Sequence, residues 1–182
     1  MGIYIVIVVL IIVIIMGVSA YNGLIELEEN IKKAFANIDV LLMQRSDELP
    51  KLVDTVKAFV SHEKEIFANV LKARETMLSA KTVSEKAEAS GGISNALKSV
   101  FALSEAYPEL GSNENFMKLQ GRISDLENSI ADRREFYNES VNNYNIRIKT
   151  IPDVIIARII NLSAKEMFQV PEEKKEDVKI NL

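Results

Sequence analysis

Residues 3–20 read IYIVIVVLIIVIIMGVSA, and this stretch decides how the rest of the chain must fold. Almost every side chain in it is apolar, and none carries a charge. With a helical rise of about 1.5 Å per residue it would reach roughly 27 Å, close to the ~30 Å hydrocarbon core of a bilayer. The stretch predicts a transmembrane anchor over residues 1–22. Its apolar surface is carried by Ile3, Ile7, Leu10, Ile14 and Val18.

A cleaved signal peptide is the main alternative for this stretch, because residues 18–20 form a small-residue cleavage pattern. A signal peptide normally has a basic region before its apolar core, and only Met1 and Gly2 precede the core here. We therefore expect a retained anchor. Lys32 and Lys33 are the first cations after it, so the positive-inside rule favours a cytoplasmic body behind a single membrane span.

Composition argues against several classes of function. The net charge of −4 comes from interspersed charges without a basic stripe, so no nucleic-acid partner is expected. The absence of Cys excludes disulfides, thiol catalysis and iron–sulfur ligation. His62 is the single His, so two-His zinc motifs fail, and the glycines form no phosphate-binding loop. We expect no enzyme, no metal and no cofactor.

Beyond the anchor, apolar residues recur at three- and four-residue spacing in several segments, which predicts amphipathic helices. The first is expected to continue the anchor as one long rod that ends near residues 46–48, before Pro50. The Gly91-Gly92 pair predicts a loop over residues 82–92, and Pro108 is expected to stop the third helix. The predicted helices are residues 21–45, 50–80, 93–107 and 114–149.

Four such helices joined by short turns, without a strand pattern in the body, predict an all-α protein. Its architecture is an N-terminal transmembrane helix followed by an antiparallel up-and-down bundle of long helices. The coiled-coil-like heptad spacing of the fourth helix is typical of a seam in such a bundle. The expected organisation is an anchor over residues 1–22, a bundle domain over residues 23–165, and a charged tail over residues 166–182.

Several polar residues fall on helix faces that should be apolar, which makes them candidates for a polar network. Charged side chains there must either pair or extend from the edge of the apolar face to water. Two Tyr-Asn pairs repeat seven residues apart and so share one helix face; they predict either a core seam with a hydrogen-bonded edge or a ladder that fixes register or binds a partner. The candidates are Glu63, Arg133, Arg134, Tyr137, Asn138, Tyr144 and Asn145.

The apolar stretch VIIARIINL, residues 154–162, is too short to span a membrane. The chain reverses direction at each predicted turn of the bundle, so the fourth helix should run back towards the membrane and end on the bilayer side. The stretch is therefore either an interfacial helix with its cation among lipid headgroups or a segment packed on the base of the bundle. Its candidate lipid-contacting residues are Ile155, Ile156, Arg158, Ile159 and Ile160.

The last residues alternate in a strand-like way at Val178, Ile180 and Leu182. Such an end could pair with Phe168 and Val170 or with the tail of a second copy, which predicts a homo-oligomer. A disordered tail is the alternative, since residues 171–177 are almost wholly charged.

Two long segments also carry a family resemblance. The first segment, residues 21–65, reads YNGLIELEENIKKAFANIDVLLMQRSDELPKLVDTVKAFVSHEKE, and the second, residues 102–152, reads ALSEAYPELGSNENFMKLQGRISDLENSIADRREFYNESVNNYNIRIKTIP. They resemble the two halves of the LemA family. The chain departs from the family pattern at Met43 and Ser46, where members are usually more basic. The resemblance implies a single-pass prokaryotic membrane protein with a cytoplasmic helical bundle, and it implies no catalytic residues.

Two hypotheses of function follow. In the first, the protein is a membrane-anchored scaffold or self-assembling interaction module without catalysis of its own. In the second, it is a regulatory or signalling subunit of a membrane enzyme or stress-response complex. The expected partners are the lipid bilayer, a second copy of the chain, and a membrane protein.

Overall fold

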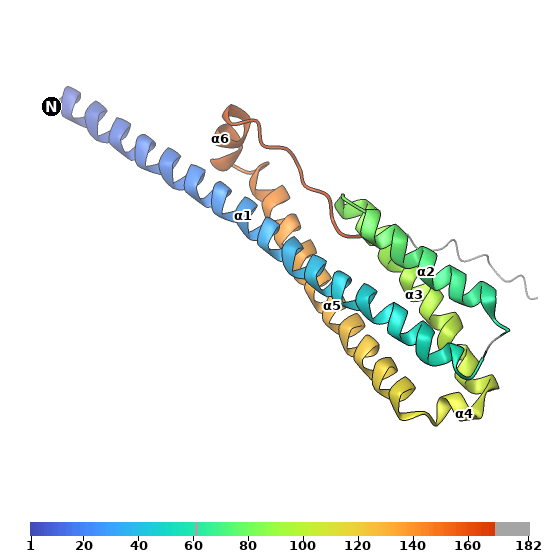
Figure 1. Ribbon diagram of the computed structural model, residues 1–182. Helices are drawn as coiled ribbons and strands as arrows, with labels where there is room; N and C mark the ends of the chain where they lie inside the picture. The colour runs from blue at the N-terminus through green and yellow to red at the C-terminus, as the bar shows by residue number, and fades with distance from the viewer. Residues whose placement is uncertain (61, 170–182) are drawn as a thin grey trace, which may run out of the picture. The chain divides into compact units, whose positions relative to one another are not determined.

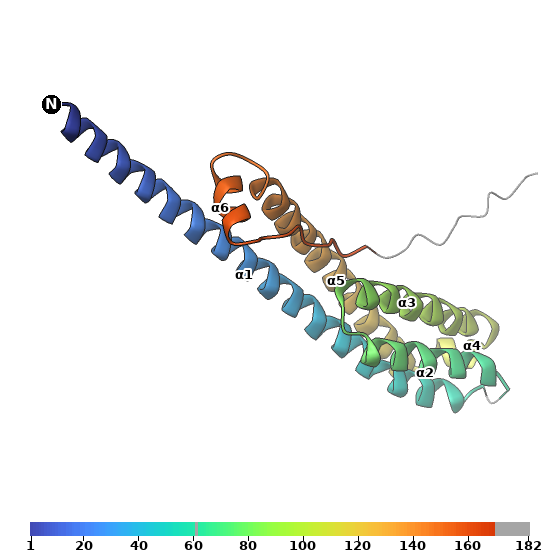
Figure 2. The ribbon, with the colours of Figure 1, turned by 90° about the horizontal axis from the view of Figure 1, so that it is seen from above.

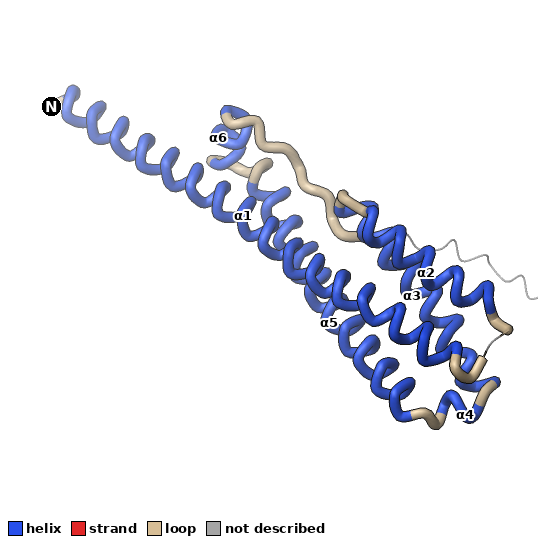
Figure 3. Tube along the Cα trace, in the orientation of Figure 1, coloured by secondary structure: helices blue, strands red, loops and turns tan. Residues whose placement is uncertain are grey.

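The computed structural model describes residues 1–60 and 62–169, and helices dominate this part of the chain (Figure 1). Its elements are α1 (Gly2–Lys57), α2 (Lys64–Ser79), α3 (Val83–Ala106), α4 (Pro108–Gly111), α5 (Glu114–Arg147) and α6 (Asp153–Ile159). The described residues contain no strand, and their non-helical parts are short connections and one extended segment after α6 (Figure 3). The all-α prediction is confirmed.

Helix α1 joins the predicted anchor to the bundle without a break over 56 residues. The side chains of residues 3–16, 18 and 19 of the apolar stretch, including the five named for the anchor, are exposed, whereas Ala20 is buried. Among the described helices, α1 alone is long and apolar enough to cross a membrane, judged by length and composition. The predicted helix end near residues 46–48 was wrong, because α1 continues through Pro50.

The continuation through Pro50 has a specific cause. A proline has no backbone N–H, so Pro50 leaves the carbonyl of Ser46, four residues earlier, without its helical donor. Arg74 of α2 replaces that donor: its Nε lies 3.3 Å from the carbonyl oxygen of Ser46. The helix can therefore pass the proline without an orphaned buried carbonyl.

Two other predicted boundaries were also wrong. The predicted helix over residues 50–80 is divided between two elements: residues 50–57 belong to α1, and α2 begins only at Lys64. The predicted loop over residues 82–92 is the first part of α3. Thr82 and Glu85 form a capping box there: the Thr82 hydroxyl accepts from the Glu85 N–H, and the Glu85 carboxylate accepts from the Thr82 N–H. This cap starts the helix despite the glycine pair.

The described chain forms two compact units, to both of which α1 and α5 contribute. Unit 1 holds residues 1–40 and 130–167. In it α1 and α5 run antiparallel, because the rings of Phe35 and Tyr137 lie 5.8 Å apart and Gly23 lies against the Arg147 guanidinium. Helix α6 packs beside α1 in the same unit (Figure 2).

Unit 2 holds residues 41–129 and Phe168 and forms the four-helix part of the bundle. The last turns of α1, the first half of α5, and helices α2 and α3 enclose its apolar core. Phe101 of α3 packs edge-on against Phe116 of α5, with ring centroids 6.3 Å apart. The fully buried core side chains are Leu42, Leu49, Leu52, Val56, Val70, Met77, Ile93, Leu97, Val100, Phe116 and Ile123.

Candidate functional site

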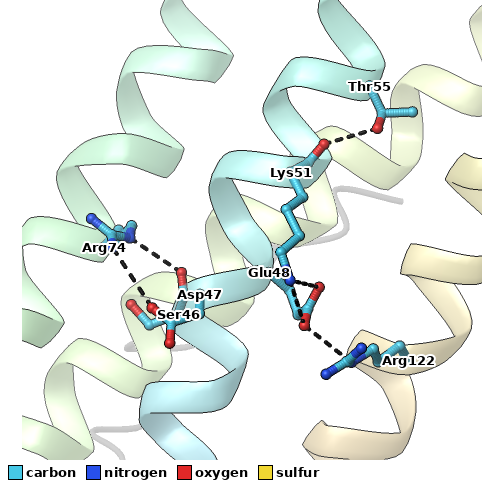
Figure 4. Close-up of polar contacts among 7 residues, drawn as sticks. All are labelled: Ser46, Asp47, Glu48, Lys51, Thr55, Arg74 and Arg122. Atoms are coloured by element: carbon cyan, nitrogen blue, oxygen red, sulfur yellow. Dashed lines mark hydrogen bonds and ion pairs between the residues drawn. The ribbon is translucent and has the colours of Figure 1, made fainter.

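The most polar part of unit 2 is a single turn of α1, residues 45–48, which we call the polar turn. Figure 4 shows the contacts of its last three residues: Arg74 reaches the Ser46 backbone carbonyl and the Asp47 side chain, and Arg122 reaches Glu48. Arg74 of α2 lies 3.7 Å from the Asp47 carboxylate, and Arg122 of α5 lies 3.0 Å from the Glu48 carboxylate. The polar turn therefore connects α1 to both helices.

Arg45 supplies the connection to α3. Its side chain is only 1% exposed, and its guanidinium donates to the Ser90 carbonyl (3.1 Å), the Ser90 hydroxyl (2.7 Å) and the Ser94 hydroxyl (3.2 Å). The half-exposed carboxylate of Glu127 on α5 lies 3.6 Å away and also accepts a 2.8 Å bond from Ser94. A buried guanidinium is tolerated only with such partners, so this cluster fixes how α1, α3 and α5 pack.

Glu48 brings a second buried charge into the same turn. Its side chain is 3% exposed, and its two cation partners, Lys51 and Arg122, reach it from the exposed surface at 3.2 Å and 3.0 Å. Both cations keep contact with water while neutralising the carboxylate. The charges of the polar turn thus serve to hold helices together.

In unit 1, three of the predicted ladder residues bind an extended segment of the chain's own backbone, residues 162–167, which we call the strap. The hydroxyls of Tyr144 and Tyr137 donate to the strap carbonyls of Ser163 (3.2 Å) and Glu166 (2.9 Å). The Asn145 amide makes two 2.9 Å bonds to the backbone of Lys165, one as donor and one as acceptor. The ladder is therefore occupied by the strap.

Charge interactions hold the middle of the strap. The Lys165 ammonium lies 2.7 Å from the Glu28 carboxylate of α1 and 5.9 Å from the centroid of the Tyr144 ring. The hydrogen bond from Lys165 lowers the pKa of Glu28 from its usual 4.5. Burial raises the pKa of both Tyr137 and Tyr144, which keeps their hydroxyls protonated as donors. The strap is thus joined to both α1 and α5.

The remaining ladder and network candidates lie in separate places. Asn138 is half-buried. Glu63 is half-buried at the N-cap of α2 in unit 2, without a side-chain capping bond. Arg133 and Arg134 belong to unit 1, where Arg133 is exposed and partial burial lowers the pKa of Arg134. A pairing of Glu63 with these arginines stays a prediction.

The candidate interfacial residues fall in and just after α6. Ile155, Arg158 and Ile159 are exposed, whereas Ile156 and Ile160 are half-buried. The strand-like residues Val178, Ile180 and Leu182 lie outside the described part of the chain, so the tail prediction stays a prediction.

Unit 1 also has a surface hollow of about 400 Å³ between α1 and α5, which we call the amide hollow. We did not predict this hollow from the sequence, although four pairs of its residues are seven apart: Leu27 with Ala34, Asn30 with Asn37, Arg133 with Ser140, and Phe136 with Asn143. A seven-residue repeat on each helix was therefore the available signal. Its lining is Leu27, Asn30, Lys33, Ala34, Asn37, Arg133, Phe136, Ser140 and Asn143.

Within residues 1–60 and 62–169, no group of three or more His, Asp or Glu side chains is placed to hold a metal ion. The charges of Arg45, Glu48, Glu28 and Lys165 contact the protein's own helices and strap. The amide hollow and the apolar face of α1 lie at the surface. These are features suited to contact with other molecules.

A helix able to span a bilayer, continuous with an antiparallel bundle, defines a membrane-associated helical-bundle protein. The LemA family profile matches residues 34–182, and the chain belongs to the LemA family. This confirms the resemblance seen in the sequence.

The chain is also similar to two proteins that are named as magnetosome proteins. It is 36% identical to magnetosome protein MamQ 2 of Paramagnetospirillum magneticum over 81 residues, covering 44% of this chain and 30% of that protein. It is 24% identical to magnetosome protein MamQ of Magnetospirillum gryphiswaldense over 174 residues, covering 81% of this chain and 64% of that protein. The chain thus spans less than two thirds of the length of these relatives.

Proposed function

We propose that the protein is a single-pass, membrane-anchored interaction module that scaffolds partners or self-assembles and has no catalysis of its own. The observation that carries this proposal is the amide hollow. Phe136 stands 54% exposed at a site where Lys33 and Arg133 contribute charge and Asn30 and Asn37 contribute amides. An exposed aromatic surrounded by hydrogen-bonding groups and an arginine is typical of the residues that dominate protein interfaces.

A second copy of the chain is the proposed partner at this hollow. Amides both donate and accept hydrogen bonds, so identical surfaces can satisfy one another. The hollow itself has only cationic charges, and the exposed carboxylates Glu135 and Glu139 of α5 can supply the complement from a neighbouring copy. The alternative is a regulatory or signalling subunit of a membrane enzyme or stress-response complex, with an acidic partner protein at the hollow.

The test is the mass of the intact protein in mild detergent, measured by light scattering. We expect a multiple of the chain mass for the natural protein and a shift towards one chain for Phe136→Asp. Met117→Asp is the matched control, because Met117 is also about half exposed on α5 but lies outside the hollow. A single-chain mass with a stoichiometric enzyme in pull-downs would favour the alternative. If Phe136→Asp leaves the mass of the oligomer unchanged, the hollow is not the contact between copies.

We place the bundle on the cytoplasmic side of the membrane. Arg147 packs on Gly23, so it lies at the same end of the apolar stretch as Lys32 and Lys33. Lys149 and Arg158 follow it within one short segment of unit 1. This enrichment of cations agrees with the positive-inside rule. Protease added to intact cells should leave the bundle uncut, and its digestion without lysis would contradict this orientation.

A further inference from the structure

Helix α6 has one packed side and one exposed apolar side. Asp153 and Ala157 are 8% and 2% exposed, so they form the side that packs on the rest of unit 1. Ile155 and Ile159 are 58% and 70% exposed, and Ile151, just before the helix, is 85% exposed. Residues four apart lie on the same side of a helix, so Ile155 and Ile159 share one apolar side of α6. Ile151 adds a third exposed apolar side chain in the turn directly before the helix. We call Ile151, Ile155 and Ile159 the isoleucine row.

The position of α6 along α1 is fixed by one close contact. The Cδ1 atom of Ile156 lies 4.0 Å from where a Cβ on Gly17 would be. Gly17 belongs to the apolar stretch of residues 3–20 and lies about 4–5 Å from its end at Ala20 along the helix axis. The exposed apolar surface of α1 and the isoleucine row therefore lie at the same level of unit 1.

Charged side chains surround the base of α6. Nε of Arg147 lies 2.6 Å from the Asp153 carboxylate, which joins the end of α5 to the first turn of α6. Lys149, between Arg147 and Asp153 in the sequence, and Arg158, on α6 itself, are both exposed. An exposed apolar row with cations beside it is the pattern of a helix that lies in a membrane interface, where the cations reach headgroup phosphates. A helix of seven residues is too short to cross the membrane.

We infer that α6 is a second bilayer contact, in which the isoleucine row enters the boundary between headgroups and acyl chains beside the span. Insertion of such a helix is typically about 5–10 Å deep. This goes beyond the proposed interaction function, since it assigns a lipid-binding role to a separate element. A span alone leaves the bundle free to rotate and tilt at the surface. A second contact beside it would restrict both motions.

Because the sequence contains no Cys, a single introduced cysteine gives one labelling site in the full-length chain. We would place an environment-sensitive fluorophore at Ile155→Cys and Ile159→Cys. Ala164→Cys, exposed in the strap, and Val40→Cys, exposed about 30 Å beyond Ala20 along α1, are the controls. Each protein is placed in nanodiscs of phosphatidylcholine and phosphatidylglycerol. Quenching is measured with lipids brominated on the acyl chains and with aqueous iodide.

We expect brominated lipids to quench the labels at 155 and 159 at least about twofold more than those at 164 and 40, and iodide to show the reverse order. Strong iodide quenching at 155 and 159 with weak lipid quenching would show that the row faces water and would overturn the inference. Weak quenching by both agents would show that protein covers the row, which also overturns it. Unchanged circular dichroism verifies that each labelled chain is folded.

Discussion

The contact between Arg74 and the Ser46 carbonyl gives the sharpest prediction about this fold. Pro50 removes the N–H that would otherwise bond to this carbonyl, and Arg74 Nε occupies the position at 3.3 Å. Ser46 is fully buried in the folded chain, so its carbonyl is covered from water there. Arg74→Ala should therefore lower the free energy of unfolding, because a buried acceptor without a donor costs about 1–3 kcal/mol.

Arg74→Ala should lower the free energy of unfolding by a smaller amount when residue 50 is alanine. Pro50→Ala restores the N–H, which can then bond to the Ser46 carbonyl as in an ordinary helix. The Arg74 side chain is 33% exposed, so solvent weakens its bond, and we expect a coupling of about 1 kcal/mol between the two positions. The ion pair of Arg74 with Asp47 is lost in both backgrounds, so it cancels from the cycle.

The measurement is urea unfolding of the four proteins of this double-mutant cycle, followed by far-ultraviolet circular dichroism in mild detergent. Lys72→Ala is the matched control, because Lys72 is an exposed cation on the same helix. Lys72→Ala should change the free energy of unfolding by the same amount whether residue 50 is proline or alanine. If the Arg74 and Pro50 substitutions are additive within about 0.3–0.5 kcal/mol, the proposed replacement of the missing donor is refuted.

Three further predictions concern the buried polar groups. Arg45→Ala should cost about 2–4 kcal/mol of unfolding free energy and Glu127→Ala distinctly less, because only Arg45 is fully buried and multiply bonded; equal costs in urea unfolding would contradict this. Asn145→Ala should accelerate hydrogen exchange at the Lys165 amide, because this N–H loses the Asn145 side-chain oxygen as its acceptor. An unchanged exchange rate would show that the strap does not depend on this bond. The pKa of Glu28 is lowered in the folded chain, so its ion pair contributes stability that is fully present above pH 4.5 and is lost as the pH falls through the folded-state pKa. Acid should therefore loosen the strap in the natural chain and accelerate hydrogen exchange at Lys165. Glu28→Gln should abolish this acid dependence of Lys165 exchange.

These predictions share one physical basis. A bundle of long helices joined by short turns can slide in register, since apolar side chains fit one another at several offsets. Buried groups that require a particular partner remove this freedom, because a shift of one turn leaves a guanidinium or a carbonyl unsatisfied. The polar turn performs this role in unit 2, and the Tyr-Asn ladder with its strap performs it in unit 1.

The sequence by itself determined the helical class, the apolar stretch of α1, the extent of α5 and the shared face of Tyr137 and Tyr144. All four depend on spacing along one helix, which local periodicity records directly. The family was also determined by the sequence, because it rests on strings of residues in order. The amide hollow could have been found by the same means from its seven-residue spacings.

The tertiary structure alone decided whether α1 stops at Pro50, because the donor that lets it continue comes from Arg74, which lies 28 residues after the Ser46 carbonyl that it binds. It also decided what the ladder binds, since the partner of Asn145 is a backbone segment 20 residues further on. The exposed side of α6 is likewise set by packing, because the side with Asp153 and Ala157 is buried and the opposite side is left at the surface. Each of these outcomes is set by a contact between distant residues, and local pattern contains no information about such partners.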